Sequence, residues 1–253
     1  MEPSASSALR LPRLQPFRFA RGQLSRTVRA ISSAAREKRA QMFRQAFELT
    51  ESTRILDLGS ETGANIHAVL RGTPVKPQNV HICDIHEALI AEGAERYGFV
   101  PVHARDGQEL PFDAQSFDIV YCSSVIEHVT LPKAEVWRES SGRRFRAKAR
   151  ERQMQFASEI RRLGRQYFVQ TPYRHFPVES HSWLPFMGWL PRPALLPVLA
   201  CTNKVWVKHT NPDWHLLDRG DIAELFPDAR LLEEKFAGLT KSLIAVKSEL
   251  GGC

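Results

Sequence analysis

From residue 37 onward, hydrophobic residues recur at every second position in some segments and at every third or fourth position in others. The first spacing is typical of strands and the second of helices, so the chain alternates between these elements. Strands are expected at residues 54–58, 79–83, 99–103, 117–122, 166–170, 229–236 and 242–246. Helices are expected around residues 40–47, at 64–71 and 86–97, from about 132, over 143–165 and at 219–226. This order predicts an α/β fold with a mainly parallel, doubly wound sheet and helices on both faces.

The last two expected strands are separated only by the short segment "AGLTK". Such a short connection joins antiparallel strands and cannot contain a crossover helix. We therefore expect an antiparallel hairpin at the edge of the parallel sheet.

The composition is that of one soluble globular domain with appendages, since 43% of the 253 residues are hydrophobic and 25% are charged. The four cysteines (Cys83, Cys122, Cys201 and Cys253) are widely spaced and form no C-x-x-C pair. Neither a disulfide framework nor a zinc site is indicated by this spacing. A reducing, cytoplasmic compartment fits this use of cysteine best.

The net charge of +7 is unevenly distributed: two regions carry +7 each, and the rest of the chain carries −7. Residues 1–50 carry ten Lys and Arg against three acidic residues, and residues 143–165 carry nine against two. The Arg- and Ser-rich residues 1–36 are expected to form a basic, flexible or loosely docked arm. An organelle transit peptide has a similar composition and is the alternative.

The second basic region predicts an amphipathic helix. Its hydrophobic residues share one face at a spacing of three to four: Phe145, Ala149, Phe156, Ile160 and Leu163. The Arg and Lys side chains then point outward, either as a solvated face or as a docking face for an acidic partner.

An apolar insertion of about residues 172–215 follows the fifth expected strand. Its segment 183–200 contains four prolines and Arg192, which argues against a transmembrane helix. We expect this insertion to cover the sheet edge as a lid, or to pack as an ordinary subdomain.

Carboxylates stand at the ends of three successive expected strands: Asp57, Asp84 and Asp106. Ligands of such sheets bind beyond the carboxyl ends of the strands, and an acid after the second strand can accept both hydroxyls of a ribose. Gly59 and Gly63 let the intervening turn pass close to a ligand.

These residues lie in "ILDLGSETGANI", "HICDIHEALI" and "DGQELPFDAQSFDIVYCSSVIEHV". The three segments resemble, in order and spacing, the motifs of class I S-adenosylmethionine-dependent methyltransferases, and the resemblance covers roughly residues 37–248. It implies a seven-stranded sheet whose last strand is antiparallel, and S-adenosylmethionine as the cofactor. It also implies a set of cofactor-binding residues: Asp57, Gly59, Ser60, Gly63, Asp84, Ile85, Asp106, Gly107 and Ser123. Within this set, Asp57 and Gly59 would serve the methionine part, Asp84 the ribose, and Asp106 with Gly107 the adenine.

Glu61 stands where this superfamily commonly has glycine, and its side chain would crowd the cofactor if it pointed inward. A Rossmann-like protein that binds another nucleotide is the alternative. A dinucleotide enzyme would have G-x-G-x-x-G, which this turn lacks.

Methyl transfer is an in-line displacement that depends on alignment, helped by a base when the acceptor must lose a proton. Glu127 and His128 follow the fourth expected strand, at the position that faces the substrate in many related enzymes. His128 could equally pack at a helix start. In relatives resembling quinone-biosynthesis O-methyltransferases, a Glu three residues before this pair completes a metal site. Here Ser124 occupies that position, so we expect no metal.

A second polar cluster follows the fifth expected strand: Tyr173, His175, Glu179 and His181. We assign His175 and His181, with Glu127 and His128, to catalysis, and Tyr173, Glu179 and Trp183 to substrate binding. The spacing H-x3-E-x-H also permits a metal triad, but nothing in the sequence fixes its geometry.

The sequence thus predicts a methyltransferase acting on a small-molecule, lipid-linked or glycan acceptor. Nucleic acid is not expected, because the aromatic residues of the insertion alternate with prolines and not with Lys or Arg. Two alternatives remain open: an RNA or protein methyltransferase that docks through the basic helix, and a non-catalytic interaction protein with the same fold. The acceptor, the methylated atom and the oligomeric state are not predicted.

Overall fold

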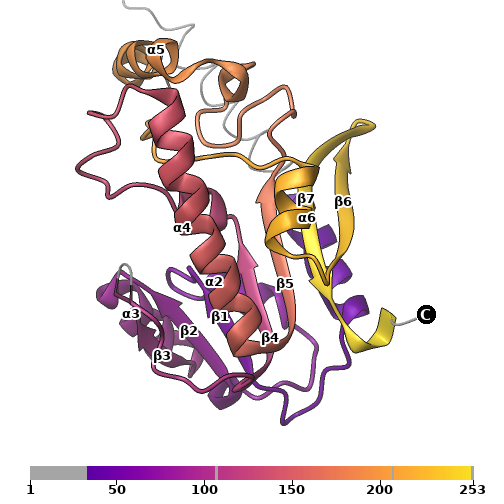
Figure 1. Ribbon diagram of the computed structural model, residues 1–253. Coiled ribbons are helices and arrows are strands. Elements are labelled where there is room, and N and C mark those ends of the chain that lie inside the picture. The colour runs from indigo at the N-terminus through magenta and orange to yellow at the C-terminus, as the bar shows by residue number, and fades with distance from the viewer. Residues whose placement is uncertain (1–32, 106–107, 207, 252–253) are drawn as a thin grey trace, which may run out of the picture.

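The computed structural model describes residues 33–105, 108–206 and 208–251. Within them, seven strands form one sheet in the order β3-β2-β1-β4-β5-β7-β6 (Figure 1). The strands are β1 (Ile55–Leu58), β2 (Val80–Asp84), β3 (Val100–His103), β4 (Phe117–Ser123), β5 (Gly164–Pro172), β6 (Arg230–Phe236) and β7 (Leu239–Lys247). Strands β1 to β5 pair in parallel, and β7 is antiparallel to both of its neighbours. The α/β fold expected from the sequence is confirmed.

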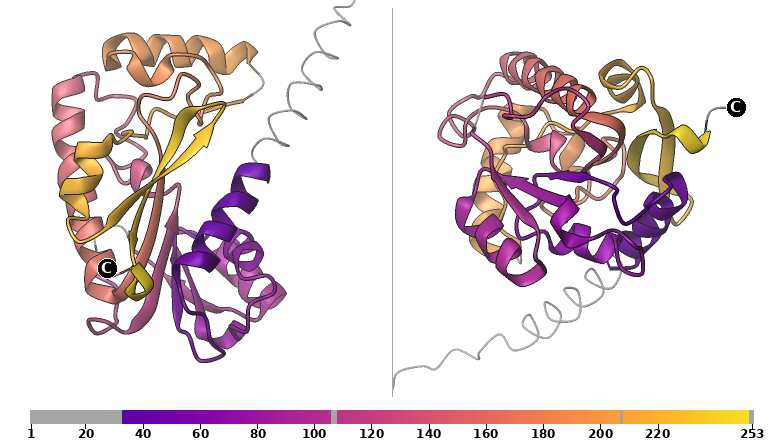
Figure 2. Two further views of the ribbon diagram at one scale, coloured as in Figure 1. Left: turned by 90° about the vertical axis from the view of Figure 1, so that its right-hand side faces the viewer. Right: turned by 90° about the horizontal axis from the view of Figure 1, so that it is seen from below.

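Helices cover both faces of the sheet (Figure 2). One face packs against α4 (Gly142–Leu163) and α6 (Arg219–Leu225), and the other against α2 (Ala64–Val69), α3 (Glu87–Tyr97) and an N-terminal helix described from residue 33 to 46. Successive strand residues enter opposite cores: Val120 lies with α4 and α6, whereas Tyr121 lies with the N-terminal helix. This alternation explains why the strands are continuous hydrophobic runs.

The expected hairpin is present, and its turn is tighter than the sequence suggested. Ala237 and Gly238 both have left-handed backbone conformations, with φ of 48° and 80°. Two successive left-handed residues form the turn type whose twist matches that of paired strands. Consequently β7 begins at Leu239 and lies between β5 and β6.

The helix expected from about residue 132 does not form, because its backbone carbonyls bond elsewhere. Residues 133–138 are turns, and α4 begins only at Gly142, where the Ser141 hydroxyl accepts a hydrogen bond from the Arg144 amide. The guanidinium of the distant Arg192 donates hydrogen bonds to the carbonyl oxygens of Val136 and Glu139. This arginine fixes the segment as a loop.

The basic helix is present as α4, with the expected division of faces. Its buried residues are Phe145, Ala149, Gln153, Ala157, Ile160 and Leu163. Phe156, expected on the same face, is partly buried against the core.

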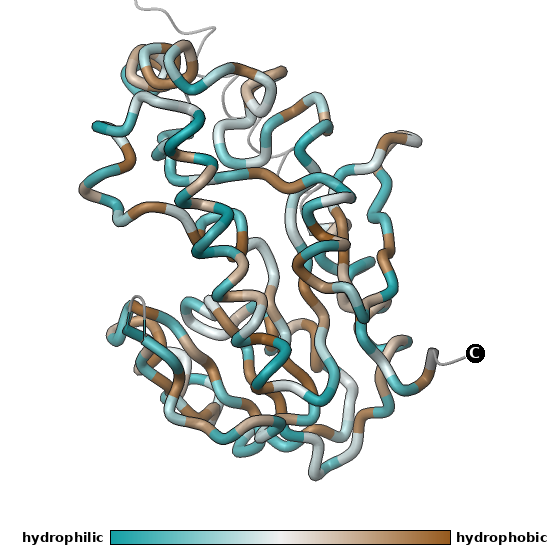
Figure 3. Tube along the Cα trace, viewed as in Figure 1, coloured by the Kyte–Doolittle hydropathy of each residue, from teal (hydrophilic) through white to brown (hydrophobic). Residues whose placement is uncertain are grey.

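The insertion between β5 and α6 contains a helix that the sequence did not predict, α5 (Arg192–Val205). Proline is compatible with the first turn of a helix, although Pro197 lies inside this one. Leu195 and Leu199 pack with Trp214 and Leu216 into a small separate core. Both hydrophobic and hydrophilic residues occur along α5 (Figure 3). Among the described residues, no helix combines the length and apolar character needed to cross a membrane.

Residues 33–36 of the expected basic arm are helical and continue into the rest of the N-terminal helix. The remainder of the expected arm, residues 1–32, lies outside the described residues.

Candidate active site

The turn after β1 is shaped by two glycines with left-handed backbones, Gly59 (φ 73°) and Gly63 (φ 70°). A Cβ atom on Gly59 would lie 2.4 Å from the side chain of Val125, so a larger residue would not fit there. The amides of Gly59 and Ser60 both donate to the carbonyl oxygen of Cys83 in β2. This turn is thereby fixed against the end of the neighbouring strand.

Asp57 presents an unsatisfied carboxylate beside this turn. Its side chain is buried, and its Oδ2 atom has no hydrogen-bond partner among the described residues, nor has the Oγ atom of Ser60. Burial, with a smaller contribution from the nearby Asp84, raises the pKa of Asp57 well above its usual value. An unpaired buried carboxylate is costly, so a cationic ligand group would be favoured here. These residues therefore fit the ammonium group of a methionine moiety.

Asp84 ends β2, and its carboxylate is held by the backbone. Its Oδ2 atom accepts from the amide of Glu61 and its Oδ1 atom from that of His86, both at 3.0 Å. Ile85 follows with 50% of its surface exposed. Each carboxylate oxygen retains a further lone pair, so a ribose contact remains a prediction. Asp106 and Gly107 lie outside the described residues.

Glu61 adopts the left-handed conformation for which glycine is suited, with φ of 49°. Its side chain is exposed, and its backbone amide donates to Asp84. Glycine would adopt this backbone conformation without strain.

A cavity of about 680 Å³ lies beyond the carboxyl ends of β1, β4 and β5. It joins the turn after β1 to the insertion, the N-terminal helix and the β6–β7 hairpin. Its lining includes Asp57, Gly59, Ser60, Glu61, Ser123, Ser124, Gln170, Tyr173, Phe176, Glu179, Trp183, Leu216, Phe236, Arg36, Arg39 and Lys241. Predicted cofactor residues and predicted substrate residues therefore share one cavity.

The basic residues of this lining were not among the predicted site residues. Arg39 donates to the hydroxyl of Ser123 at 3.1 Å and pairs with Glu234 at 3.0 Å. Burial, together with the positive charges of Arg39 and Arg36, lowers the pKa of Lys241. The sequence predicted a helix around residues 40–47 and a basic arm before it, and neither prediction indicates which side chains line a cavity.

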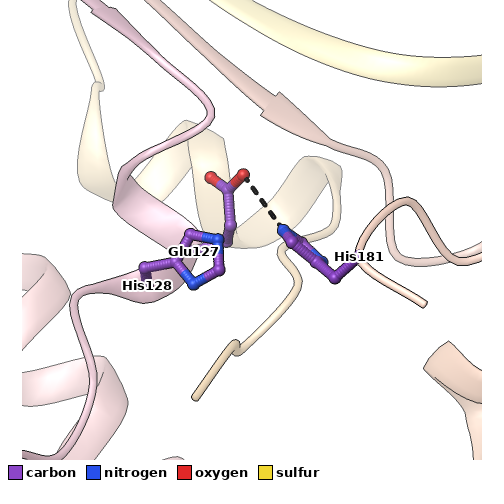
Figure 4. A group of neighbouring side chains, drawn as sticks. All are labelled: Glu127, His128 and His181. Carbon is purple, nitrogen blue, oxygen red and sulfur yellow. Dashed lines mark ion pairs between the residues drawn. The ribbon is translucent and has the colours of Figure 1, made fainter. Parts of the chain in front are cut away.

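Glu127, His128 and His181 form a compact cluster next to this cavity (Figure 4). Glu127 and His128 belong to the short 3-10 helix η2 (Ile126–His128), and His181 belongs to the insertion. Each residue offers one ligand atom, and these atoms all lie within 4.8 Å of one another. The Nε2 atom of His181 lies 3.8 Å from the Oε1 atom of Glu127.

Carboxylates surround His181 and control its charge. Its Nδ1 atom lies 2.5 Å from the Oε1 atom of Glu179. Burial alone would lower the pKa of His181, but Glu127 and Glu179 outweigh it and raise this pKa to about 9. For Glu179, burial acts upward, and bonding to His181 and Ser182 lowers the pKa to about 2. Glu127 and Glu179 therefore favour the protonated, positively charged form of the His181 ring.

The other predicted residues are divided between two places. Tyr173, Glu179 and Trp183 line the cavity, as expected of substrate-side residues. His175 is exposed and contacts the ring of Tyr173, outside the cluster. The spacing H-x3-E-x-H therefore does not form one triad. His181 is grouped instead with the pair that follows β4.

The chain is similar to known proteins in its domain type and in its fold. Residues 55–142 match the family model described as a methyltransferase domain. A chain from the complex between the Haloferax volcanii Trm112 methyltransferase activator and a methyltransferase is similar, with a TM-score of 0.51 and 14% identity over 84% of this chain and 88% of that chain. A structure described as PigF with SAH has a TM-score of 0.50 and 13% identity, covering 83% of this chain and 60% of that chain. No curated protein matches the sequence significantly.

The strand order and the turn after β1 define a class I methyltransferase fold. Within this fold, residues 55–142 match a methyltransferase domain. This match agrees with the resemblance to methyltransferases that the sequence motifs suggested.

Proposed function

We propose that this protein transfers the methyl group of S-adenosylmethionine to a small-molecule, lipid-linked or glycan acceptor. One observation carries the proposal: the unpaired carboxylate of Asp57 and the side chains of the insertion line the same cavity of about 680 Å³. That volume is typical of sites for small ligands. A cofactor and an acceptor can meet there without a rearrangement of the sheet.

The cofactor would be held by residues on the β1 and β2 side. Asp57 would accept from the ammonium group, Gly59 and Gly63 would let the backbone approach, and Asp84 would accept from the ribose. Ser60, Ile85 and Ser123 complete the described part of this proposed set. The cofactor supplies an electrophilic methyl group. The chain itself has to orient the acceptor in line with it and to exclude water.

The acceptor would lie on the insertion side of the cavity. Phe176, Trp183 and Leu216 provide apolar surface, and Tyr173 and Lys241 provide polar contacts. This mixture of apolar surface with a few polar groups is the usual lining of a small-molecule site.

The electrostatics of α4 favour this proposal over docking of RNA or an acidic protein. Arg150 pairs with Asp221 and Glu224 of α6, and Arg162 pairs with Glu159. Part of the basic charge is therefore neutralised within the chain. Binding of RNA that weakens steeply with salt would instead support the alternative.

We also propose that the protein works in a reducing compartment such as the cytoplasm. Cys83 and Cys122 are buried as free thiols, and Cys201 is exposed and free. An exposed free thiol fits reducing surroundings.

The test begins with calorimetric and thermal-shift titrations of the full chain with S-adenosylmethionine and S-adenosylhomocysteine. A methyl-transfer screen of metabolite, lipid and glycan extracts follows, using radiolabelled cofactor. Saturable binding and transfer to a small acceptor are expected. Binding without any transfer would favour the non-catalytic alternative, and absence of binding would refute the proposal.

A further inference from the structure

We propose that Glu127, His128 and His181 bind a divalent transition-metal ion, with Zn²⁺ the ion they suit best. The sequence indicated no metal, because Ser124 stands where related enzymes place a third ligand. The fold supplies another third ligand, from the insertion more than fifty residues further along the chain.

The donor atoms of the three residues lie close together. Glu127 is completely buried, and its Oε1 atom has no hydrogen-bond partner in the described part of the chain. This oxygen faces the Nε2 atom of His181 at 3.8 Å, and the group as a whole spans no more than 4.8 Å. Bonds to Zn²⁺ are about 2.0–2.2 Å, so a small contraction would bring all three atoms into coordination.

Neighbouring side chains support the three ligands through hydrogen bonds. The Nδ1 atom of His128 bonds to Asp213 at 3.2 Å, and that of His181 bonds to Glu179 at 2.5 Å. With Nδ1–H donating to a carboxylate, loss of the Nε2 proton leaves a lone pair there for a metal, so binding at His181 would release a proton. This carboxylate–histidine arrangement is typical of metal ligands. Likewise, Thr171 donates to the Oε2 atom of Glu127 at 3.0 Å, which leaves Oε1 free.

The surroundings also hold the ligands rigidly. The ring of His181 stacks on Trp214, with ring centres 5.7 Å apart and planes 14° from parallel. The amide of His215 donates to the carbonyl oxygen of Glu127 at 2.8 Å. His128 keeps 35% of its side chain exposed, which gives the ion a route from solvent.

Two imidazoles and one carboxylate suit Zn²⁺ and its transition-metal neighbours, whereas Mg²⁺ and Ca²⁺ prefer oxygen ligands. Water would complete the coordination. None of the three ligands lines the described cavity. The inferred role is to fasten the insertion to η2 and thereby to fix the acceptor side of the site.

The experiment uses the full chain, freed of metal by chelation, and ZnCl2 as the probe. We expect about one Zn²⁺ per chain by elemental analysis after dialysis. We also expect saturating Zn²⁺ to raise the melting temperature by about 5 °C or more, and EDTA to reverse the rise. No stoichiometric binding and no shift would overturn the proposal.

Variants then locate the site. His181→Ala and His128→Ala should each weaken Zn²⁺ binding at least tenfold in competition with a chelating dye, and Glu179→Gln should weaken it about ten- to a hundredfold through its support of His181. His175→Ala is the matched control, an exposed histidine of the same insertion, and should bind like the wild type. If His181→Ala fails to fold, Zn²⁺ binding by His128→Ala tests the assignment of the ligands. Unchanged binding in His128→Ala, or equal loss in the control, would overturn the assignment.

Discussion

The guanidinium of Arg39 forms a buried ion pair with Glu234 at 3.0 Å, joining the N-terminal helix to β6. Their side chains are only 10% and 2% exposed, and Arg39 also donates to Ser123 at the end of β4. The N-terminal helix is thereby attached to both halves of the sheet beside the cavity.

This pair should behave as a coupled unit. Arg39→Met removes the ion-pair partner of the buried Glu234 and should lower the free energy of unfolding by about 3–5 kcal/mol. The double variant Arg39→Met, Glu234→Leu should be more stable than Arg39→Met, because it removes the stranded charge. Urea unfolding of the two single variants and the double variant measures the coupling. Additive losses would show that the two side chains act independently.

Asp57→Asn should raise the free energy of unfolding of the ligand-free protein and weaken cofactor binding. The raised pKa of Asp57 means that its contribution to stability is fully present below pH 3.8, the unfolded value, and is lost as pH rises through the folded value. The variant should therefore gain stability over the wild type as pH increases. Urea unfolding at pH values from about 5 to about 8 measures this trend.

The same variant should bind S-adenosylmethionine about tenfold or more weakly, since a charge-assisted hydrogen bond is lost. Asp113→Asn, an exposed aspartate away from the cavity, is the control and should change neither property. If Asp57→Asn bound the cofactor as the wild type does, Asp57 would not contact its ammonium group.

Two substitutions at Glu61 separate backbone strain from crowding. Glu61→Gly removes a left-handed non-glycine residue and should raise the free energy of unfolding by about 1 kcal/mol, whereas Glu61→Ala keeps the strain and should not. Because the Glu61 side chain is exposed, Glu61→Ala should leave the dissociation constant of S-adenosylmethionine within about twofold. A tenfold tightening in Glu61→Ala would show that the glutamate obstructs the cofactor.

Arg192 should be needed to hold the insertion in place. It bonds to the carbonyl oxygens of Val136, Glu139 and Pro212, and its guanidinium carbon lies 3.5 Å from the ring centre of Phe145. Arg192→Met would leave buried carbonyls unpaired and should cost about 3 kcal/mol or more. Thermal melting and limited proteolysis should show an earlier transition and faster cleavage between residues 172 and 218. Unchanged cleavage would mean that the small core around Leu199 holds the insertion by itself.

The sequence predicted most of the sheet because its strands are short hydrophobic runs between polar turns. Residues such as Ile55 and Val120 face packed cores on one or the other side, which leaves a clear pattern. The loop before α4 was not predicted because it depends on hydrogen bonds from Arg192, which is distant in the sequence. The helix α5 was not predicted because it contains a proline, which is unfavourable inside a helix.

The candidate site shows the same division. Asp57, Gly59 and Gly63 occur in one short turn, so their spacing was informative. His181 acquires its partners only when the insertion folds back on η2, and no spacing in the sequence relates it to Glu127. The exposed position of His175 shows that a shared motif does not ensure a shared site.

The most direct test of the central claim is a calorimetric titration of the full chain with S-adenosylmethionine, repeated with Asp84→Ala. We predict saturable binding of one cofactor per chain, and an affinity about tenfold weaker or more when the carboxylate of Asp84 is removed. Absence of binding to the folded wild-type chain, with either S-adenosylmethionine or its demethylated product, would contradict the claim that this chain binds the cofactor.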